Sequence, residues 1–167
     1  MIVVLLGVAG SGKTTIGEML ALRLEVPFLD ADSLHTPECV KRMGHGDPLT
    51  DVERDAWFER VLGAAAEGAP LVLACSALRR KHRDRLRAAD ETRMFLLDAP
   101  AEALERRLRQ RTGHFFGASL LRSQLETFEP PLPGEGITEL DATHPPTTVL
   151  KAILSELEAD SSDLCGS

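Results

Sequence analysis

The chain has 167 residues, 43% of them hydrophobic, and a formal net charge of −7. The length fits one domain over residues 1–167, and the composition excludes a disordered chain. No apolar run approaches the roughly 20 residues that span a bilayer, and the negative charge argues against nucleic acid or anionic lipid as a partner.

The N-terminus predicts a strand that leads into a phosphate-binding loop. Ile2–Leu6 is fully apolar, and the next eight residues match G-x-x-x-x-G-K-[ST] and open a helix that runs to about Leu24. Glycines let the backbone turn around a phosphate, and the helix N-terminus adds partial positive charge. A chance glycine-rich turn is the alternative, but the strand before it and the helix after it argue against that. The predicted ATP-binding residues here are Gly7, Val8, Ala9, Gly10, Ser11, Gly12, Lys13, Thr14 and Thr15.

Within this loop, two side chains have a predicted chemical role. Lys13 is expected to reach the β- and γ-phosphates, and the Thr14 hydroxyl is expected to bind Mg²⁺. We favour ATP over GTP because the chain has no guanine-reading N-K-x-D segment.

A second short strand, Pro27–Asp30, is followed by a pair of carboxylates, Asp30 and Asp32. In open α/β sheets, ligands bind at the carboxyl ends of the strands. Residues at i and i+2 of an extended segment share a side, so one carboxylate can hold Mg²⁺ while the other accepts the proton of an attacking hydroxyl. An Asx turn or a helix cap explains the same spacing equally well.

The remaining elements alternate between short β-rich and longer helical segments, which predicts a parallel sheet covered by helices. Thr50 and Glu53 form a capping box that opens a helix to about Glu67, with Gly68 as its stop. Further predicted strands cover 71–75, 94–97 and 137–140. Arginine-rich helices follow the first two, a closing helix covers 148–157, a loop covers 129–136, and the tail 160–167 is expected to fray.

The charges and cysteines give weaker signals. Eleven of the 19 basic residues lie between Arg79 and Arg111, a distribution that suits an enzyme for small anions or two solvated helices. The three cysteines are scattered, which indicates ordinary thiols in a reducing cytoplasm. The sequence leaves a monomer and a homodimer open.

Four further blocks carry a resemblance. They are Asp30-Ala31-Asp32-Ser33-Leu34-His35, the segment from Met43 through Trp57, the segment from Ala74 through Arg87, and the segment from Arg111 through Glu126. With the phosphate loop, they resemble the gluconokinase family of P-loop small-molecule kinases over the chain to about Pro131. The chain departs from the family pattern at Thr36, Cys39, Ala56, His82, Phe116 and Gly117, most of which flank the expected acceptor pocket or lid.

The resemblance implies an α/β fold with a five-stranded parallel sheet in the order 2-3-1-4-5, flanked by helices. It also implies a mobile lid at about 112–125. The implied reaction transfers the γ-phosphate of ATP, with Mg²⁺, to the 6-hydroxyl of D-gluconate. The more distant shikimate kinases have a similar D-x-D after the second strand.

The resemblance also assigns roles to single residues. Asp32 is the expected catalytic group beside Lys13. Asp30 is the expected metal residue beside Thr14 and supports Mg²⁺ through the groups that bind the ion directly. Arg107 and Arg111 are the expected phosphate clamps of the lid. Expected substrate-binding residues are Asp32, His35, Arg54, Arg83 and His114. A surface ion pair with Asp51 is the alternative for Arg54, a solvated helix face for Arg83, and a structural role for both histidines. Trp57 is expected to be a core anchor.

Two other functions stay open at this point. One is a kinase of the same fold that acts on shikimate, another aldonate or a nucleoside monophosphate. The other is a nucleotide-binding regulator without phosphoryl transfer, against which Lys13, Thr14, Asp30 and Asp32 argue.

Overall fold

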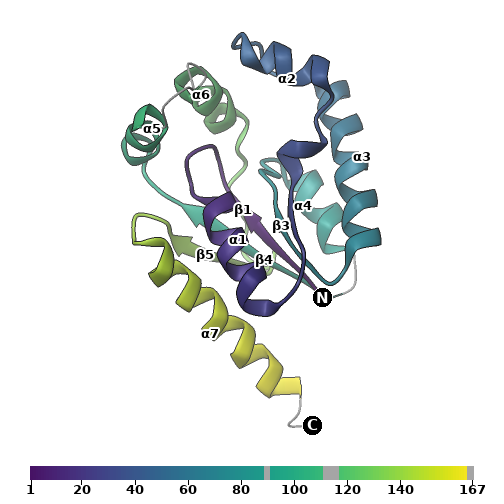
Figure 1. The fold of residues 1–167 in the computed structure, drawn as a ribbon, viewed down its shortest axis with the longest axis vertical. Helices are drawn as coiled ribbons and strands as arrows, with labels where there is room; N and C mark the ends of the chain where they lie inside the picture. The colour runs from purple at the N-terminus through teal and green to yellow at the C-terminus, as the bar shows by residue number, and fades with distance from the viewer. Residues whose placement is uncertain (89–90, 111–116, 165–167) are drawn as a thin grey trace.

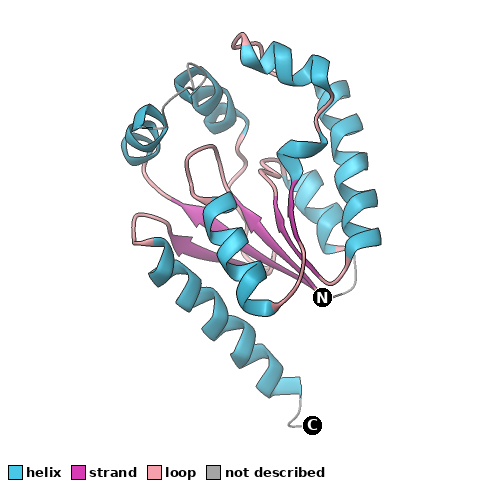
Figure 2. Ribbon diagram, viewed as in Figure 1, coloured by secondary structure: helices cyan, strands magenta, loops and turns pink. Residues whose placement is uncertain are grey.

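The central feature of the fold is one parallel sheet with helices on both faces (Figures 1 and 2). The computed structural model describes residues 1–88, 91–110 and 117–164. The strands lie in the order β2-β3-β1-β4-β5, and each pair is parallel. Their bounds are β1 (Ile2–Leu6), β2 (Phe28–Asp30), β3 (Leu71–Ala74), β4 (Thr92–Asp98) and β5 (Ile137–Asp141). The predicted sheet and its strand order are confirmed.

The central strand β1 is buried on both sides, as its uninterrupted apolar sequence requires. Ile2, Val4 and Leu6 pack with residues of α3 (Asp51–Gly68) and α4 (Arg80–Arg87). Val3 and Leu5 face the opposite way and pack with α1 (Lys13–Leu24) and α7 (Pro146–Leu164). The loop that follows β1 therefore starts from a strand that is packed between two hydrophobic cores.

The remaining helices gather around the carboxyl ends of the strands (Figure 1). These are the 3₁₀ turn η1 (Ala31–Leu34), α2 (Pro37–Gly44), α5 (Ala101–Gln110) and α6 (Gly117–Thr127). Helices α5 and α6 contact each other, and Leu104, Leu108 and Leu121 from them pack with Val8 of the phosphate loop. A lid was expected in this region, and the helix α6 was not predicted.

Most of the predicted boundaries agree with the structure. The capping box of α3 is present, since the Glu53 amide donates to the Thr50 hydroxyl and the Thr50 amide donates to the Glu53 carboxylate. The expectation of a frayed tail from residue 160 is wrong for 160–164, where α7 continues to Leu164. Extending a formed helix costs little, and the sequence offers no glycine or proline before Gly166.

One glycine brings α1 close to the strand that carries the acidic pair. A Cβ on Gly17 would lie 2.4 Å from Cε2 of Phe28 in β2, so a larger residue would push that ring away. The missing side chain lets the helix that starts at the phosphate loop pack directly beside β2. The position of Asp30 relative to Thr14 depends on this close packing.

Candidate active site

The loop between β1 and α1 has the geometry of a phosphate-binding loop. Gly7, Gly10 and Gly12 have φ angles of 142°, 83° and 99°, which favour glycine. At Gly7, a Cβ would also lie 2.8 Å from the carbonyl oxygen of Leu97. Within the described residues, no side chain caps the N-terminus of α1, so its first amides can bind an anion. The Lys13 ammonium donates to the Val8 carbonyl at 3.0 Å and so lies over the loop.

Thr14 and Asp30 are brought together at the end of the sheet. The Thr14 hydroxyl donates to Oδ2 of Asp30 at 2.8 Å, and the other carboxylate oxygen accepts from the Asp32 amide at 3.0 Å. Asp30 therefore also caps η1, so the cap considered for this motif is real and belongs to Asp30. A hydroxyl and a carboxylate beside a phosphate loop are hard oxygen ligands, and they fit Mg²⁺, which keeps several waters and binds few protein groups.

The turn that carries Asp32 is held in place by α3. The Trp57 indole donates to the Ala31 carbonyl at 2.8 Å, and Nε of Arg60 donates to the Leu34 carbonyl at 2.9 Å. Trp57 is 3% exposed, which confirms it as a core anchor. Asp32 itself has a side chain that is 75% exposed, so its carboxylate is open to a ligand.

His35 continues this arrangement. Its ring stacks on Trp57 with 4.7 Å between centroids, and Nε2 lies 3.9 Å from Oδ1 of Asp32. Burial lowers the pKa of His35, although the Asp32 carboxylate opposes that shift. Nδ1 is buried and has no hydrogen-bond partner among the described residues. A neutral imidazole beside an open carboxylate can accept or donate a hydrogen bond to a hydroxylated ligand.

A cavity of about 470 Å³ lies next to this turn. Asp32, His35, Arg54 and Trp57 line one part of it. The remaining wall comes from α2, the segment before α3, the loop after β3, His82 of α4 and α6, and it is partly apolar. Ala77 in that loop has a φ of 33°, an uncommon conformation for a residue other than glycine. The cavity suits a small molecule with a few polar groups.

Arg54 supplies positive charge to the cavity. Burial lowers the pKa of Arg54, and the nearby Arg79 guanidinium adds to the shift. Arg54 Nε is buried without a partner in the described part of the chain, and Nη2 makes only a 3.4 Å contact with the Leu49 carbonyl. Asp51, the alternative partner for Arg54, instead binds Arg79 at 2.8 Å. The guanidinium therefore keeps donors for an anionic ligand.

His82 gives the cavity wall a further nitrogen group. The ring stacks on Phe58 with 4.4 Å between centroids, and Nε2 lies 3.3 Å from Oδ1 of Asp55. Burial lowers the pKa of His82, and the bond to Asp55 opposes that shift.

The site therefore combines a phosphate loop, an oxygen pair for a cation and a cavity with both a carboxylate and a guanidinium. A gluconokinase of Gluconobacter oxydans is 40% identical over 164 residues, covering 94% of this chain and 91% of that protein. The chain belongs to the gluconokinase family. It is a kinase, and residues 2–131 match a family model described as an AAA domain.

Solved structures agree with this membership of the gluconokinase family. A gluconokinase from Sinorhizobium meliloti superposes with a TM-score of 0.87 at 36% identity, covering 97% of this chain and 94% of that one. A shikimate kinase from Aquifex aeolicus has a TM-score of 0.65 at 24% identity, covering 96% of this chain and 98% of that one. The second likeness shows the fold alone.

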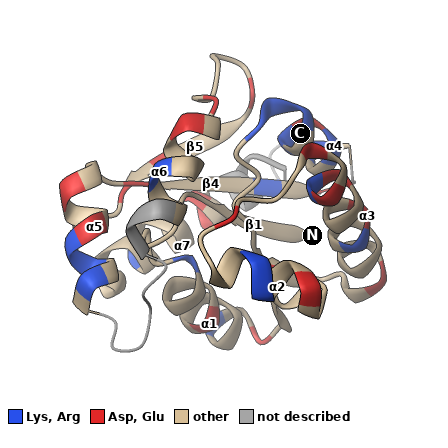
Figure 3. Cartoon of the chain, turned by 90° about the horizontal axis from the view of Figure 1, so that it is seen from above, with Lys and Arg blue, Asp and Glu red and all other residues tan. Residues whose placement is uncertain are grey.

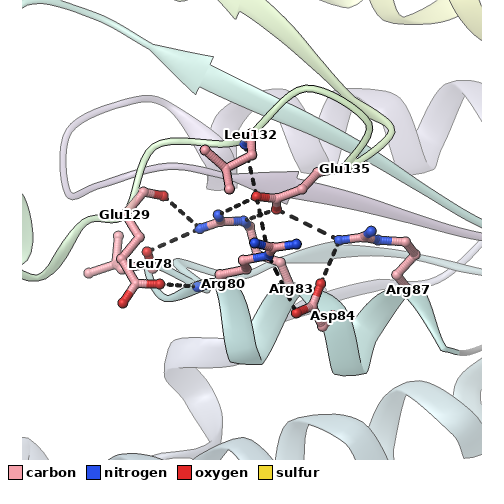
Figure 4. Close-up of polar contacts among 8 residues, drawn as sticks. All are labelled: Leu78, Arg80, Arg83, Asp84, Arg87, Glu129, Leu132 and Glu135. Carbon is pink, nitrogen blue, oxygen red and sulfur yellow. Dashed lines mark hydrogen bonds and ion pairs between the residues drawn. The ribbon is translucent and has the colours of Figure 1, made fainter.

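Arg83 does not have the position expected of a substrate anchor in this gluconokinase-family chain. It is 1% exposed and does not line the cavity. Nε and Nη2 donate to the two carboxylate oxygens of Glu135 at 3.0 and 3.2 Å, and Nη1 donates to the carbonyls of Leu78 and Glu129 (Figure 4). The structure corrects the predicted role, because the guanidinium is committed to structural partners. The solvated helix face considered as the alternative is wrong as well.

The arginines expected in the lid have different outcomes. Arg107 lies beside the phosphate loop, where Nη1 donates to the Gly10 carbonyl at 3.4 Å and Nη2 donates to the Ala142 carbonyl. Arg111 and His114 lie outside the described residues, as does the first part of the expected lid at 112–116. The clamp role of Arg107 stays a prediction.

Two polar residues were not predicted, one at the site and one buried away from the cavity. Gln124 of α6 accepts a hydrogen bond from the Ala9 amide at 2.6 Å and lines the cavity. Glu135, in the loop before β5, is 2% exposed and holds Arg83. Gln124 lies in one of the blocks that resemble the family, which was the available signal. Nothing in the sequence around Glu135 distinguishes it from the other acidic residues of the C-terminal part.

Many of the charged residues lie on solvated helices, and the described cysteines are ordinary thiols, as the sequence suggested. Figure 3 shows basic and acidic residues interspersed along α3 and α5, and exposed arginines such as Arg85 and Arg109 pair with nearby glutamates. Cys39 and Cys75 are free and buried, and burial raises the pKa of Cys75 to about 12. Among the described helices, none has the length and apolar character needed to cross a bilayer.

Proposed function

We propose that this chain phosphorylates D-gluconate with ATP to give 6-phospho-D-gluconate. The observation that carries the proposal is the pairing of Asp32 with Arg54 in one cavity beside the phosphate loop. An aldonate has a primary hydroxyl at one end and a carboxylate at the other. A site that phosphorylates it therefore needs a proton acceptor for the hydroxyl and, at some distance, a cationic side chain for the carboxylate. The names of the family members support the same substrate.

On the donor side, the loop amides and the N-terminus of α1 bind the phosphates of ATP, and Lys13 offsets charge on the β- and γ-phosphates. Thr14 and Asp30 hold Mg²⁺. When bound, Mg²⁺ supplies positive charge to the phosphate oxygens. Arg107 and Arg111 complete the clamp around the transferred group.

On the acceptor side, Asp32 holds the 6-hydroxyl of gluconate and accepts its proton as the new O–P bond forms and the bond to the leaving ADP breaks. His35, braced by Trp57, and His114 bind acceptor hydroxyls. Arg54 binds the carboxylate, because its planar guanidinium can offer two parallel donors. With Arg83 committed to Glu135, His82 is one further polar group in the cavity wall that can contact this end of the substrate.

The alternatives have less support. The likeness to shikimate kinase concerns the fold alone. A nucleotide-binding regulator would not need an open carboxylate beside the Thr14 and Asp30 pair.

The proposal is tested by measuring ADP release with Mg-ATP and a panel of acceptors. We expect turnover with D-gluconate and little with shikimate, glucose or nucleoside monophosphates. Phosphorus NMR of the product would show a phosphate monoester on carbon 6. Equal turnover with a neutral sugar, or ADP release that does not depend on any acceptor, would contradict the proposal.

We further propose that the enzyme acts in the cytoplasm as one domain on a small molecule, with neither nucleic acid nor membrane as a partner. The net charge of −7 and the mixed surface charges support this. A homodimer stays a prediction, and light scattering of the purified protein would test it.

A further inference from the structure

The starting point is a contact between α6 and the phosphate loop. The backbone amide of Ala9 donates to Oε1 of Gln124 at 2.6 Å, across 115 residues of sequence. Amides of such a loop bind phosphate oxygens when a nucleotide is present. In this structure, the carboxamide oxygen of Gln124 accepts from the Ala9 amide, which could otherwise donate to a bound anion.

Gln124 also faces the acceptor side. It lines the same cavity as Asp32 and Arg54, together with Leu120, Ser123 and Thr127 of its own helix. A single side chain therefore reaches from the loop that binds the donor to the cavity proposed to bind the acceptor. Its carboxamide has one acceptor oxygen and two N–H donors, which suits both tasks.

The helix that carries Gln124 is anchored on both sides of it. Leu121 is 1% exposed and packs with Leu104 and Leu108 of α5. Just after α6, the carbonyl of Glu129 accepts from Arg83 and its carboxylate accepts from the Arg80 amide (Figure 4). The backbone near Gln124 is thus well supported, and a rotation of its side chain alone can release the Ala9 amide.

We propose that Gln124 is a positioning residue that acts on both substrates, the nucleotide and the acceptor. It accepts from the Ala9 amide while the loop is empty, and it yields that amide to a phosphate oxygen of the nucleotide. The exchange is favourable because a charged oxygen is the stronger acceptor. The released carboxamide then binds a hydroxyl of the acceptor in the cavity, a step that rests on the proposed function.

The proposal predicts opposite effects on the two substrates. Gln124→Met keeps the length of the side chain but removes the competing oxygen and the donors. Nucleotide should then bind more tightly, by about two- to tenfold, the range expected for one neutral hydrogen bond. The KM for gluconate should rise by a similar factor. If Gln124 had a purely structural role, Gln124→Met would instead weaken the binding of both substrates and lower the melting temperature of the protein.

The experiment measures binding of ADP and of the β,γ-imido analogue of ATP by calorimetry, with Mg²⁺ and without acceptor. Gln124→Met should bind at least one of them more tightly than wild type, and Gln124→Glu should bind both more weakly, because its carboxylate competes for the amide and repels phosphate. Glu126→Gln is the matched control, since that exposed residue of α6 does not line the cavity. Nucleotide binding that is unchanged or weaker in Gln124→Met would overturn the proposal.

A second variant guards against misfolding. Gln124→Asn keeps the carboxamide, but its side chain is one methylene shorter and should not reach the Ala9 amide. We therefore expect this variant to bind nucleotide more tightly than wild type. The gluconate arm uses steady-state kcat and KM at saturating ATP. If the wild type did not use gluconate, the proposed function would fail while the nucleotide arm would still decide the role of Gln124.

Discussion

Arg83 of α4 and Glu135 of the loop before β5 form a buried, two-pronged ion pair, with N–O distances of 3.0 and 3.2 Å. Both side chains are only 2% exposed, and Oε1 of Glu135 also accepts from the Leu132 amide. The pair joins the loop that follows α6 to the helix that follows β3. Its expected contribution is therefore to the stability of this corner of the fold.

Arg83→Ala should destabilise the protein by up to about 3–5 kcal/mol, because the buried Glu135 loses its two-pronged partner and keeps only the longer ionic contacts with Arg80 and Arg87, at 3.9 and 3.7 Å. Urea unfolding followed by circular dichroism measures this change. Arg109→Ala is the control, since that side chain is 74% exposed and pairs with Glu105 on the same helix; it should cost no more than about 1 kcal/mol. A stable Arg83→Ala protein with a raised KM for gluconate would restore Arg83 as a substrate anchor.

The same pair gives a prediction for the pH dependence of stability. The Arg83 guanidinium holds the pKa of Glu135 below its ordinary value of 4.5, so the unfolded chain takes up this proton more readily than the folded one. The stabilisation is present above pH 4.5 and is lost as the pH falls through the folded pKa. Glu135→Gln should be less stable than wild type at pH 7, and the difference should shrink toward pH 3.5. A constant difference in unfolding free energy would contradict this.

Lys13→Ala should reduce kcat by about 10²- to 10³-fold, because a preorganised charge near the transferred phosphoryl group is lost. The melting temperature should change less than the rate, since the ammonium donates to a carbonyl of the same loop. Lys151→Ala, an exposed residue of α7, is the control. A Lys13→Ala protein that retained most of the wild-type rate would remove Lys13 from the mechanism.

Asp32→Asn should lower kcat by about 10²-fold or less with a small effect on ATP binding, since a general base matters less when the transition state is loose. Asp30→Asn is the informative comparison, because Asp30 contacts Thr14. That variant should need more Mg²⁺ for half-maximal activity. If Asp32→Asn behaved like Asp30→Asn, then Asp32 would belong to the metal site.

Arg54→Ala should reduce kcat/KM for gluconate by roughly tenfold to a few hundredfold, the effect of losing about 1–3 kcal/mol from a desolvated ionic contact. Turnover of glucose, which lacks the carboxylate, should barely change. Arg54→Lys keeps the charge but not the planar fork and should be intermediate. Equal losses for both sugars would mean that Arg54 acts on the shape of the cavity.

The phosphate loop could be predicted because all of its signals are local. Gly7 to Thr14 lie between an apolar strand and a helix, and three positive φ angles fall on glycines. The role of Arg83 was predicted wrongly because its partner Glu135 is 52 residues away in the sequence. The surrounding segment, RKHRDRLR, contains several arginines, and nothing local distinguishes Arg83 from the others. Gln124 was missed for a similar reason, since its contact with Ala9 depends on how α6 packs over the strand ends. Long-range polar pairs leave no periodic pattern in a sequence.

The packing of β1 between two hydrophobic cores has a consequence for how an enzyme of this fold can evolve to use a different acceptor. The phosphate loop follows a strand that is packed between two hydrophobic cores, so we expect that strand to tolerate few substitutions. The acceptor cavity is instead enclosed by α2, α3, α4 and α6 at the periphery of the sheet, and His82 and the cavity-lining residues of α2 lie in those helices. Selection for a new acceptor can therefore alter the outer helices while the chemistry of phosphate transfer is inherited intact.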